Sequence, residues 1–249
     1  MTKACKIFHF ALSGNLTGNR TVKKKPQAAD LLHAKPIAAP AERNLSRNEA
    51  AAASEVRIIG GTLGGRKIAY SGDVRTRPMK DRTREAIFNL LTDRIVGFCA
   101  IDLFAGTGAL GIEAISRGAA RAVFCEKHFP TADLIRRNAK ELAIADKVEV
   151  LGCDSFLNMR RMKRDGQTFD AGRPWVVFFS PPYAFYVDRR EEMLALINDV
   201  FELAPSGSML VVEADGKFDV SALPDAESWR IREYYPAVVG LYRKEGSGL

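Results

Sequence analysis

The sequence predicts an α/β fold in which a mostly parallel sheet carries helices on both faces. Short, nearly continuous apolar runs alternate with longer stretches of helical periodicity, and such runs are typical of strands buried on both sides. A turn with three glycines, at residues 106–111, joins the first of these runs to a helical stretch. The chain of 249 residues is long enough for one large domain, or for one domain and a modest extension.

The composition narrows the class of protein. Hydrophobic residues make up 47% of the chain and charged residues 27%, as in an ordinary globular protein. No apolar run reaches the roughly 18 residues that a membrane-spanning helix needs, so we expect a cytoplasmic protein that binds no membrane. The four cysteines lack CxxC spacing and the three histidines lack metal-ligand spacing. We therefore expect reduced core thiols and no metal site.

The formal net charge of +7 is distributed unevenly. Residues 1–54 contain 9 basic and 3 acidic residues, residues 55–95 contain 9 and 5, and residues 96–249 contain 19 and 22. Residues 1–54 show no sustained periodicity, which predicts a disordered basic extension; the alternatives for its role are an inert tail, a weak RNA-binding tail and, less favoured, an organellar transit peptide. The surplus in residues 55–95 indicates a polyanionic partner.

Residues 55–95 predict a hairpin followed by a helix. Val56–Ile59 and Arg66–Tyr70 have strand character and flank a glycine-rich turn. A helix is predicted to begin at Asp81, because its apolar residues fall on one face. These residues are Ile87, Leu90, Leu91 and Ile95.

Residues 96–249 predict the sheet domain. The five predicted parallel strands are Cys99–Phe104, Arg121–Cys125, Val148–Leu151, Trp175–Phe179 and Met209–Glu213. The helices predicted between them are Ala109–Ser116, Ala132–Leu142, Ser155–Lys163 and Arg190–Leu203. Two further strand-like segments, Trp229–Tyr235 and Val238–Arg243, follow. Five parallel strands and a terminal hairpin are the layout of the Rossmann-like class I methyltransferase sheet, which has seven strands with one antiparallel.

The turn after the first strand has the features of a nucleotide-cofactor site. The glycines of Asp102–Gly111 permit a tight turn and a close approach of the backbone to a ligand. Glu126 follows the next strand, where a carboxylate can accept hydrogen bonds from two ribose hydroxyls. Asp102 favours S-adenosylmethionine (SAM) over NAD, because a carboxylate there suits a cationic ligand and would repel a pyrophosphate. Asp154, after the third strand, is either a partner of the adenine amino group or the N-cap of the helix that begins at Ser155.

A second motif, Ser180-Pro181-Pro182-Tyr183, directly follows the apolar strand Trp175–Phe179. It resembles the (Asp/Asn/Ser)-Pro-Pro-(Tyr/Phe) motif of methyltransferases that modify exocyclic amino groups of bases. The two prolines restrict the loop, so that the first side chain and a backbone carbonyl can accept hydrogen bonds from the target amino group while the aromatic ring stacks on the base. On its own the tetrapeptide would also fit a rigid turn.

Together these motifs resemble the RsmD family of bacterial small-subunit (16S) rRNA guanine-N2 methyltransferases. The resemblance rests, in chain order, on Val56–Gly65, Arg77-Pro78, Asp81–Asn89, Asp102–Gly111 and Ser180–Tyr183. It implies a SAM-dependent enzyme that methylates one guanine, guanine 966 being the family's usual target, in the rRNA of the assembling small subunit. We expect it to act as a monomer.

The resemblance also implies roles for single residues. Those that would hold SAM are Asp102, Phe104, Gly106, Gly108, Glu126 and Asp154, and those that would hold the base are Ser180, Pro181, Pro182 and Tyr183. The family usually has Asp or Asn at the position of Ser180. Serine keeps an acceptor oxygen but has no charge. Because methyl transfer to an aromatic amine depends on orientation more than on a strong base, we expect activity to be retained, and the sequence leaves open whether the serine slows the reaction or changes the target.

Basic residues of the hairpin and helix are the candidate RNA contacts. They are Arg66, Lys67, Arg75, Arg77, Arg82 and Arg84. They would position RNA through its phosphates without reading its sequence, and the alternative is an ordinary solvated charged surface. The sequence leaves open three other functions: a DNA or RNA amino-methyltransferase of other specificity, a non-catalytic RNA-binding assembly factor and, least favoured, an NAD-dependent oxidoreductase.

Overall fold

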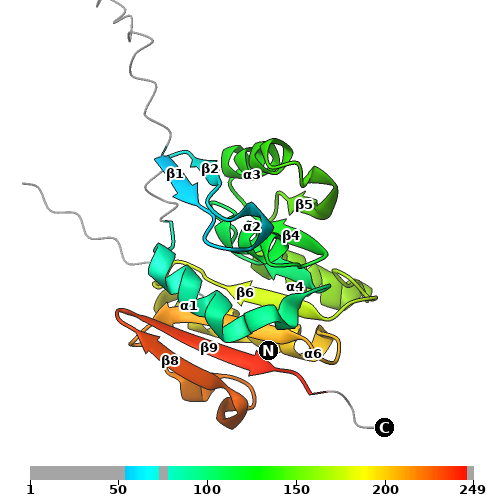
Figure 1. The fold of residues 1–249 in the computed structure, drawn as a ribbon. Helices are drawn as coiled ribbons and strands as arrows, with labels where there is room; N and C mark the ends of the chain where they lie inside the picture. The colour runs from blue at the N-terminus through cyan, green and yellow to red at the C-terminus, as the bar shows by residue number, and fades with distance from the viewer. Residues whose placement is uncertain (1–53, 73–77, 246–249) are drawn as a thin grey trace, which may run out of the picture. The chain divides into compact units, whose positions relative to one another are not determined.

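The computed structural model describes residues 54–72 and 78–245, and in this part of the chain a seven-stranded sheet has the order β5-β4-β3-β6-β7-β9-β8 (Figure 1). The parallel strands are β3 (Cys99–Asp102), β4 (Arg121–Cys125), β5 (Val148–Leu151), β6 (Trp175–Phe179) and β7 (Met209–Asp215). β9 (Ala237–Arg243) pairs antiparallel with β7 and with β8 (Arg230–Tyr234). The predicted seven-stranded mixed sheet is confirmed.

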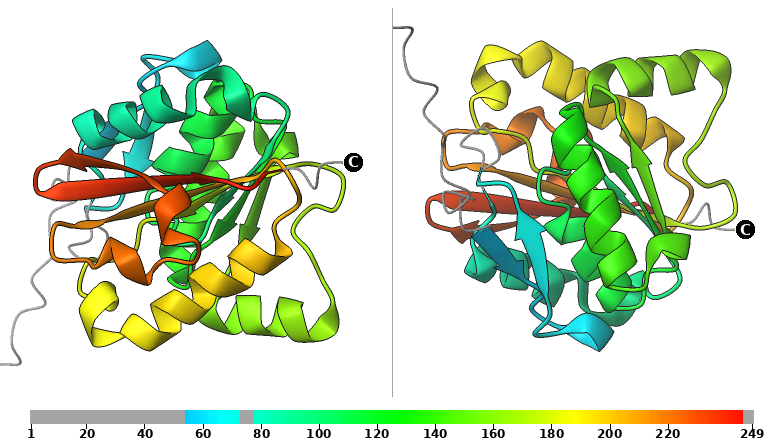
Figure 2. Two further views of the ribbon diagram at one scale, coloured as in Figure 1. Left: turned by 90° about the horizontal axis from the view of Figure 1, so that it is seen from below. Right: turned by 90° about the horizontal axis from the view of Figure 1, so that it is seen from above.

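Helices cover both faces of this sheet (Figure 2). The helices on one face are α1 (Asp81–Leu91), α2 (Ala109–Ser116) and α3 (Phe129–Glu141), and those on the other are α4 (Ser155–Asp165), α5 (Phe185–Asp188) and α6 (Arg190–Leu203). Alternate residues of each strand pack on opposite faces of the sheet, since successive side chains of a strand point in opposite directions. In β6, Phe178 packs with the first group of helices, and Val177 and Phe179 pack with the second.

Most predicted boundaries agree with the structure to within three residues. α2 and α6 occupy their predicted ranges, and α3 begins at Phe129 instead of Ala132 because Pro130 is tolerated in the first turn of a helix. α5 was not predicted, since four residues are too few to show a helical period.

The predicted hairpin, formed by β1 (Ser54–Arg57) and β2 (Lys67–Tyr70), packs against α2 and α3. The side-chain amide of Asn138 in α3 bonds both the N–H and the C=O of Ala69, each at 3.0 Å. Gly61 in the turn has a φ of +75°, and a Cβ there would lie 1.9 Å from the carbonyl oxygen of Ser116. Only glycine therefore allows the turn to approach the end of α2 so closely.

A buried carboxylate of α2, Glu113, anchors this hairpin. Its side chain is fully buried and accepts hydrogen bonds from the backbone N–H of Ile59 at 2.7 Å and of Gly60 at 2.8 Å. The Nε of Arg117 donates to the same carboxylate at 2.8 Å, and the Nε of Arg84 lies 3.9 Å away. The charge of Glu113 is thus matched by cations and by backbone donors, which is the condition under which a buried carboxylate is tolerated.

The prediction that Arg84 contacts RNA phosphates is wrong. Arg84 is fully buried, and it donates to the carbonyl oxygen of Arg57 and, at 3.0 Å, to Asp81. It lies three and four residues before Ile87 and Phe88, so it shares their buried face of α1. Burial lowers the pKa of its guanidinium. Its role is to link the hairpin, α1 and α2.

Two cysteines confirm the expectation of core thiols. Cys99 in β3 and Cys125 in β4 are buried and free, and burial raises the pKa of Cys99 to about 12. Among the described residues, none of the helices is long and apolar enough to cross a membrane. The predicted basic extension, apart from Ser54, and the candidate RNA contacts Arg75 and Arg77 lie outside the described residues.

Candidate functional site

The carboxyl ends of the parallel strands bring the predicted motifs to one edge of the sheet. Asp102, the last residue of β3, pairs in register with Phe124 of β4 and with Phe178 of β6. Glu126 and Ser180 follow these two strands directly, so three candidate residues from distant parts of the chain meet at the same edge. This is where open α/β sheets bind their ligands.

The glycine-rich turn has the conformation that its sequence requires. Gly106 and Gly108 have φ values of +50° and +77°, which side chains rarely adopt. Gly111, in the first turn of α2, lies so close to the ring of Phe124 that a Cβ would approach it to 2.4 Å. The N–H of Gly106 donates to Glu126 at 2.9 Å. The turn is therefore held against the end of β4 by Glu126.

Asp102 has an unpaired carboxylate oxygen. Its side chain is buried, and among the described residues its Oδ1 has no hydrogen-bond partner. Burial raises the pKa of Asp102 to about 7, and the N–H groups of Phe104 and Gly111 oppose this rise. Since buried carboxylate oxygens are nearly always paired, this atom fits a site that is completed by a cationic ligand or by water bound with it.

The other two predicted cofactor acids are already engaged with the backbone. Glu126 accepts from Gly106 with one oxygen and from His128, at 2.8 Å, with the other. Each oxygen has a second lone pair, so a diol could still bind. Asp154 accepts from Phe156 at 3.0 Å and from Leu157 at 3.2 Å through one oxygen and is thus the N-cap of α4, which was one of its two predicted roles.

Phe104 belongs to an aromatic cluster on the α4–α6 side of the edge. Its ring centroid lies 5.7 Å from that of Phe156 and 6.3 Å from that of Phe185. The guanidinium carbon of Arg189 lies 4.0 Å from the Phe156 centroid. Tyr186, by contrast, is a core residue that donates to the carbonyl oxygen of Phe179 at 3.3 Å. Phe104 and Phe185 are half-buried, so they can form an apolar wall next to the glycine turn.

The hydroxyls of the Ser-Pro-Pro-Tyr motif meet at a residue that the sequence analysis did not single out. Ser180 Oγ donates to Oε2 of Glu213 at 2.7 Å, and the hydroxyl of Tyr183 donates to Oε1. Glu213 lies near the end of β7 and is 6% exposed. A signal was present, because the predicted strand Met209–Glu213 ends on an acid and parallel strands share an edge. Nothing in the sequence paired that acid with the motif.

The described candidate RNA contacts lie on the hairpin and at the start of α1. Arg66 is exposed and caps the end of α3, donating to the carbonyl oxygens of Glu141 at 2.8 Å and Leu142 at 3.3 Å. Lys67 is exposed and pairs with Glu55 at 2.6 Å. Arg82 is exposed on the first turn of α1. These three side chains are open to solvent, whereas Arg84 is not.

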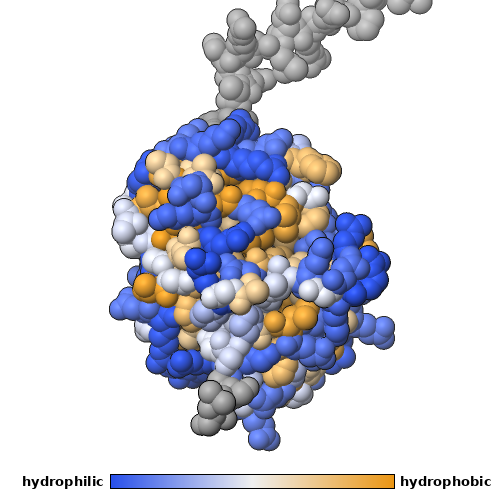
Figure 3. All heavy atoms as spheres, turned by 90° about the vertical axis from the view of Figure 1, so that its right-hand side faces the viewer, coloured by the Kyte–Doolittle hydropathy of each residue, from blue (hydrophilic) through white to orange (hydrophobic). Residues whose placement is uncertain are grey.

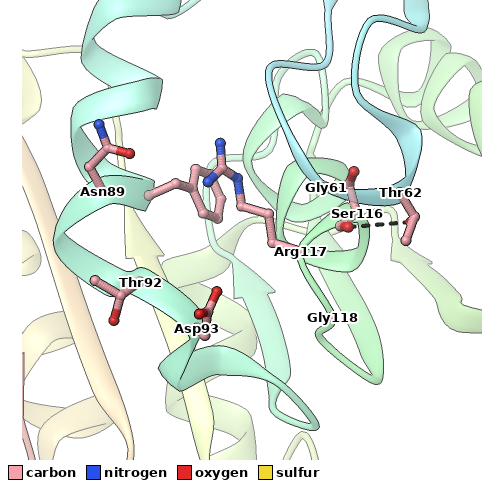
Figure 4. A pocket seen from close by; sticks show the side chains of 9 residues that line it. Gly61, Thr62, Asn89, Thr92, Asp93, Ser116, Arg117 and Gly118 are labelled. Carbon is pink, nitrogen blue, oxygen red and sulfur yellow. Dashed lines mark hydrogen bonds between the residues drawn. The ribbon is translucent and has the colours of Figure 1, made fainter.

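A cavity of about 660 Å³ lies at the opposite, amino-terminal edge of the strands (Figure 4). It is bounded by the ends of α1 and α2 and by the hairpin turn, with Arg117 5.0 Å from the ring centroid of Phe88. Figure 3 shows this side of the molecule as a largely hydrophilic surface with scattered apolar patches. None of the predicted cofactor or base-binding residues lines this cavity, because they lie at the opposite, carboxyl edge of the strands.

Comparisons of the sequence with known proteins point to one family. The family model described as "Conserved hypothetical protein 95" matches residues 56–242. The protein named ribosomal RNA small subunit methyltransferase D is 33% identical in Haemophilus influenzae, over 77% of this chain and 94% of the relative. In Escherichia coli it is 32% identical over 78% of this chain and 92% of the relative.

Two solved structures that resemble this chain are described as a methyltransferase and a methylase. The E. coli protein YhhF, described as a candidate methyltransferase, superposes with a TM-score of 0.62 at 29% identity, over 77% of this chain and 99% of that one. The H. influenzae protein HI0767 gives a TM-score of 0.57 at 27% identity, over 78% and 100% of the two chains. The chain therefore belongs to the RsmD family of methyltransferases, the family described as conserved hypothetical protein 95.

Proposed function

We propose that this protein transfers a methyl group from SAM to the N2 amino group of a guanine in small-subunit rRNA, with guanine 966 as the expected target. The observation that carries the proposal is that the Ser-Pro-Pro-Tyr loop and the Asp102–Gly108 turn follow neighbouring strands, β6 and β3, at one edge of the sheet. Both reactants can therefore be held together, and juxtaposition is the main requirement of a direct transfer.

The residues at the edge fit SAM as the cofactor. The unpaired oxygen of Asp102 suits a cation, the backbone of Gly106 and Gly108 permits close approach, and Glu126 retains lone pairs for ribose hydroxyls. Phe104 would supply an apolar wall, and the oxygen of Asp154 that does not cap α4 would face the adenine amino group. When bound, SAM supplies an electrophilic methyl group.

The motif would hold the target base. Ser180 donates its proton to Glu213, so its lone pairs remain available to accept a hydrogen bond from the amino group. Pro181 and Pro182 restrict the loop backbone. The hydroxyl of Tyr183 is bound to Glu213, which fixes the ring in one orientation for stacking on an extruded base. Orientation of the amino nitrogen toward the methyl group is the contribution of these residues.

The substrate would dock through the hairpin and α1. Arg66, Lys67 and Arg82, with Arg75 and Arg77 of the connecting segment, would contact phosphates around the target. In this proposal, a monomer acts in the cytoplasm on rRNA within an assembling particle.

Incubation with labelled SAM and hypomethylated small subunits tests the proposal. We expect one labelled guanine in the small-subunit rRNA, found by nuclease mapping and mass spectrometry of the modified nucleoside. Label on large-subunit rRNA, tRNA or DNA instead would contradict it. Binding of SAM without any transfer would favour a non-catalytic assembly factor.

A further inference from the structure

Glu213 is a buried carboxylate whose only hydrogen-bond donors among the described residues are the two hydroxyls of the base-binding motif. Ser180 approaches one oxygen at 2.7 Å and Tyr183 approaches the other. A serine hydroxyl has a single proton, and here it points at Glu213. The lone pairs of Ser180 then face away from Glu213, where an amino group of a bound base would donate to them.

The surroundings of Glu213 make it a stronger proton acceptor than an ordinary glutamate. Burial raises the pKa of its carboxyl group, while the hydrogen bonds from Tyr183 and Ser180 oppose the rise. From α5 the phenol of Tyr186 faces it, and in β9 its register partner is the apolar Val239. Within the described residues, Lys and Arg form no ion pair with Glu213. A carboxylate whose pKa is raised in this way holds a proton more readily than an ordinary glutamate does.

We propose that Glu213 is the final proton acceptor of the methyl transfer and receives the proton through the hydroxyl of Ser180. This role rests on the proposed transfer to an exocyclic amino group. The amino nitrogen forms a bond to the methyl carbon as the carbon–sulfur bond breaks, and the sulfur keeps that electron pair and leaves as a neutral thioether. The nitrogen, now positively charged, gives one proton to Ser180 Oγ while the serine proton passes to Glu213.

The proton released by the amino group is taken up by a group of this chain. The products are a neutral methylamino group, a neutral serine and a protonated Glu213, which returns its proton to water after the RNA leaves. The relay also explains how an uncharged serine can stand at position 180, where the family usually has Asp or Asn. The structure has a carboxylate one hydrogen bond behind the serine. Serine contacts the amino group, and Glu213 supplies the basicity.

Glu213→Gln tests the relay, because glutamine keeps the shape of glutamate but cannot take up the proton. We expect the single-turnover rate to fall about 10²- to 10³-fold, while the Kd values for SAM and RNA change less than twofold. The wild-type rate should rise with pH to a plateau, and this inflection should disappear in the variant. Glu227→Gln, an exposed acid between β7 and β8, is the matched control.

A rescue variant separates chemistry from structure. Ser180→Asp combined with Glu213→Gln places a carboxylate directly against the amino group. The single-turnover rate of this double variant should therefore be at least tenfold higher than that of Glu213→Gln alone. Infrared difference spectra of the unliganded protein provide a second readout. A carboxyl band that titrates above the usual glutamate range should be absent in Glu213→Gln.

The outcomes distinguish the relay from the function on which it rests. If the wild-type protein methylates no small-subunit rRNA, the proposed function fails. If it does, but Glu213→Gln keeps the inflection, or loses rate only through weaker binding of SAM or RNA, the relay is wrong and Glu213 is structural. Failure of the double variant to exceed Glu213→Gln would contradict the relay as well.

Discussion

Two buried glutamates at opposite edges of the sheet have very different surroundings. Glu113, at the amino-terminal edge, is bonded to two backbone N–H groups and to Arg117, with Arg84 close by. Glu213, at the carboxyl edge, is bonded to two hydroxyls that belong to a candidate substrate-binding loop. A carboxylate whose charge is fully compensated stabilises the fold, whereas one whose partners can exchange protons is suited to proton transfer.

The largest effect on stability is expected from removing the carboxylate of Glu113. Glu113→Ala leaves two backbone donors and the guanidinium of Arg117 without their acceptor and removes the carboxylate next to the buried Arg84, so the free energy of unfolding should fall by about 3–5 kcal/mol. Urea denaturation measures this loss. Glu85→Ala, an exposed acid on α1, is the control and should change stability by less than about 0.5 kcal/mol. A loss below 1 kcal/mol for Glu113→Ala would show that the hairpin does not depend on this anchor.

Asp102 should make stability depend on pH. Its pKa is about 7 in the folded protein against an ordinary value of 3.8, so between pH 4 and 7 the folded state holds a proton that the unfolded chain releases. The free energy of unfolding should therefore decrease as pH rises through this window, by on the order of 3–4 kcal/mol.

Asp102→Asn isolates this contribution. The variant lacks the titrating group, so its stability should fall less steeply than that of the wild type between pH 4.5 and 7.5. Urea titrations at four pH values across this range provide the comparison. Identical slopes for the two proteins would mean that Asp102 is ionised throughout.

Ser180→Ala should lower the rate of the chemical step about 10²-fold, because the amino group loses its oriented acceptor. Binding of SAM should remain nearly unchanged, since the cofactor residues belong to other strands. Single-turnover kinetics and calorimetry separate the two quantities. A loss confined to SAM affinity would overturn the assignment of Ser180 to the base.

The smallest effects on RNA binding are expected at the proposed RNA contacts. Arg82→Ala should weaken rRNA binding moderately and reduce the salt dependence of log Kd by about one unit, as for the loss of one phosphate contact. Arg84→Met should lower stability and leave the salt dependence unchanged, because Arg84 is buried. Filter binding from 50 to 300 mM salt tests both. Equal slopes for Arg82→Ala and the wild type would remove Arg82 from the interface.

Much of the fold could be predicted because its signals are local. The strands of the sheet are short apolar runs, and the glycines of the turn after β3 are required by positive φ values that are set within a few residues. Both motifs of the candidate site could be predicted for the same reason. Parallel strands alternating with helices then place both motifs at one edge.

The remaining features depend on contacts between distant residues. Arg84 reads as a surface cation beside Arg82, and only the packing of α1 on the hairpin shows that one is buried and the other exposed. Glu213 reads as the last acid of an apolar strand, and its link to Ser180 spans 33 positions.

The sequence by itself determined the order of the strands and the longer helices, the glycine turn and the Ser-Pro-Pro-Tyr motif, since each depends on residues close together in the chain, and these motifs in order indicated the family. Tertiary structure alone decided which charged side chains are buried, and it paired Glu113 with the hairpin and Glu213 with the motif. The physical reason is that the energy of a buried charge depends on the partners that the fold brings to it, and residue type does not specify those partners.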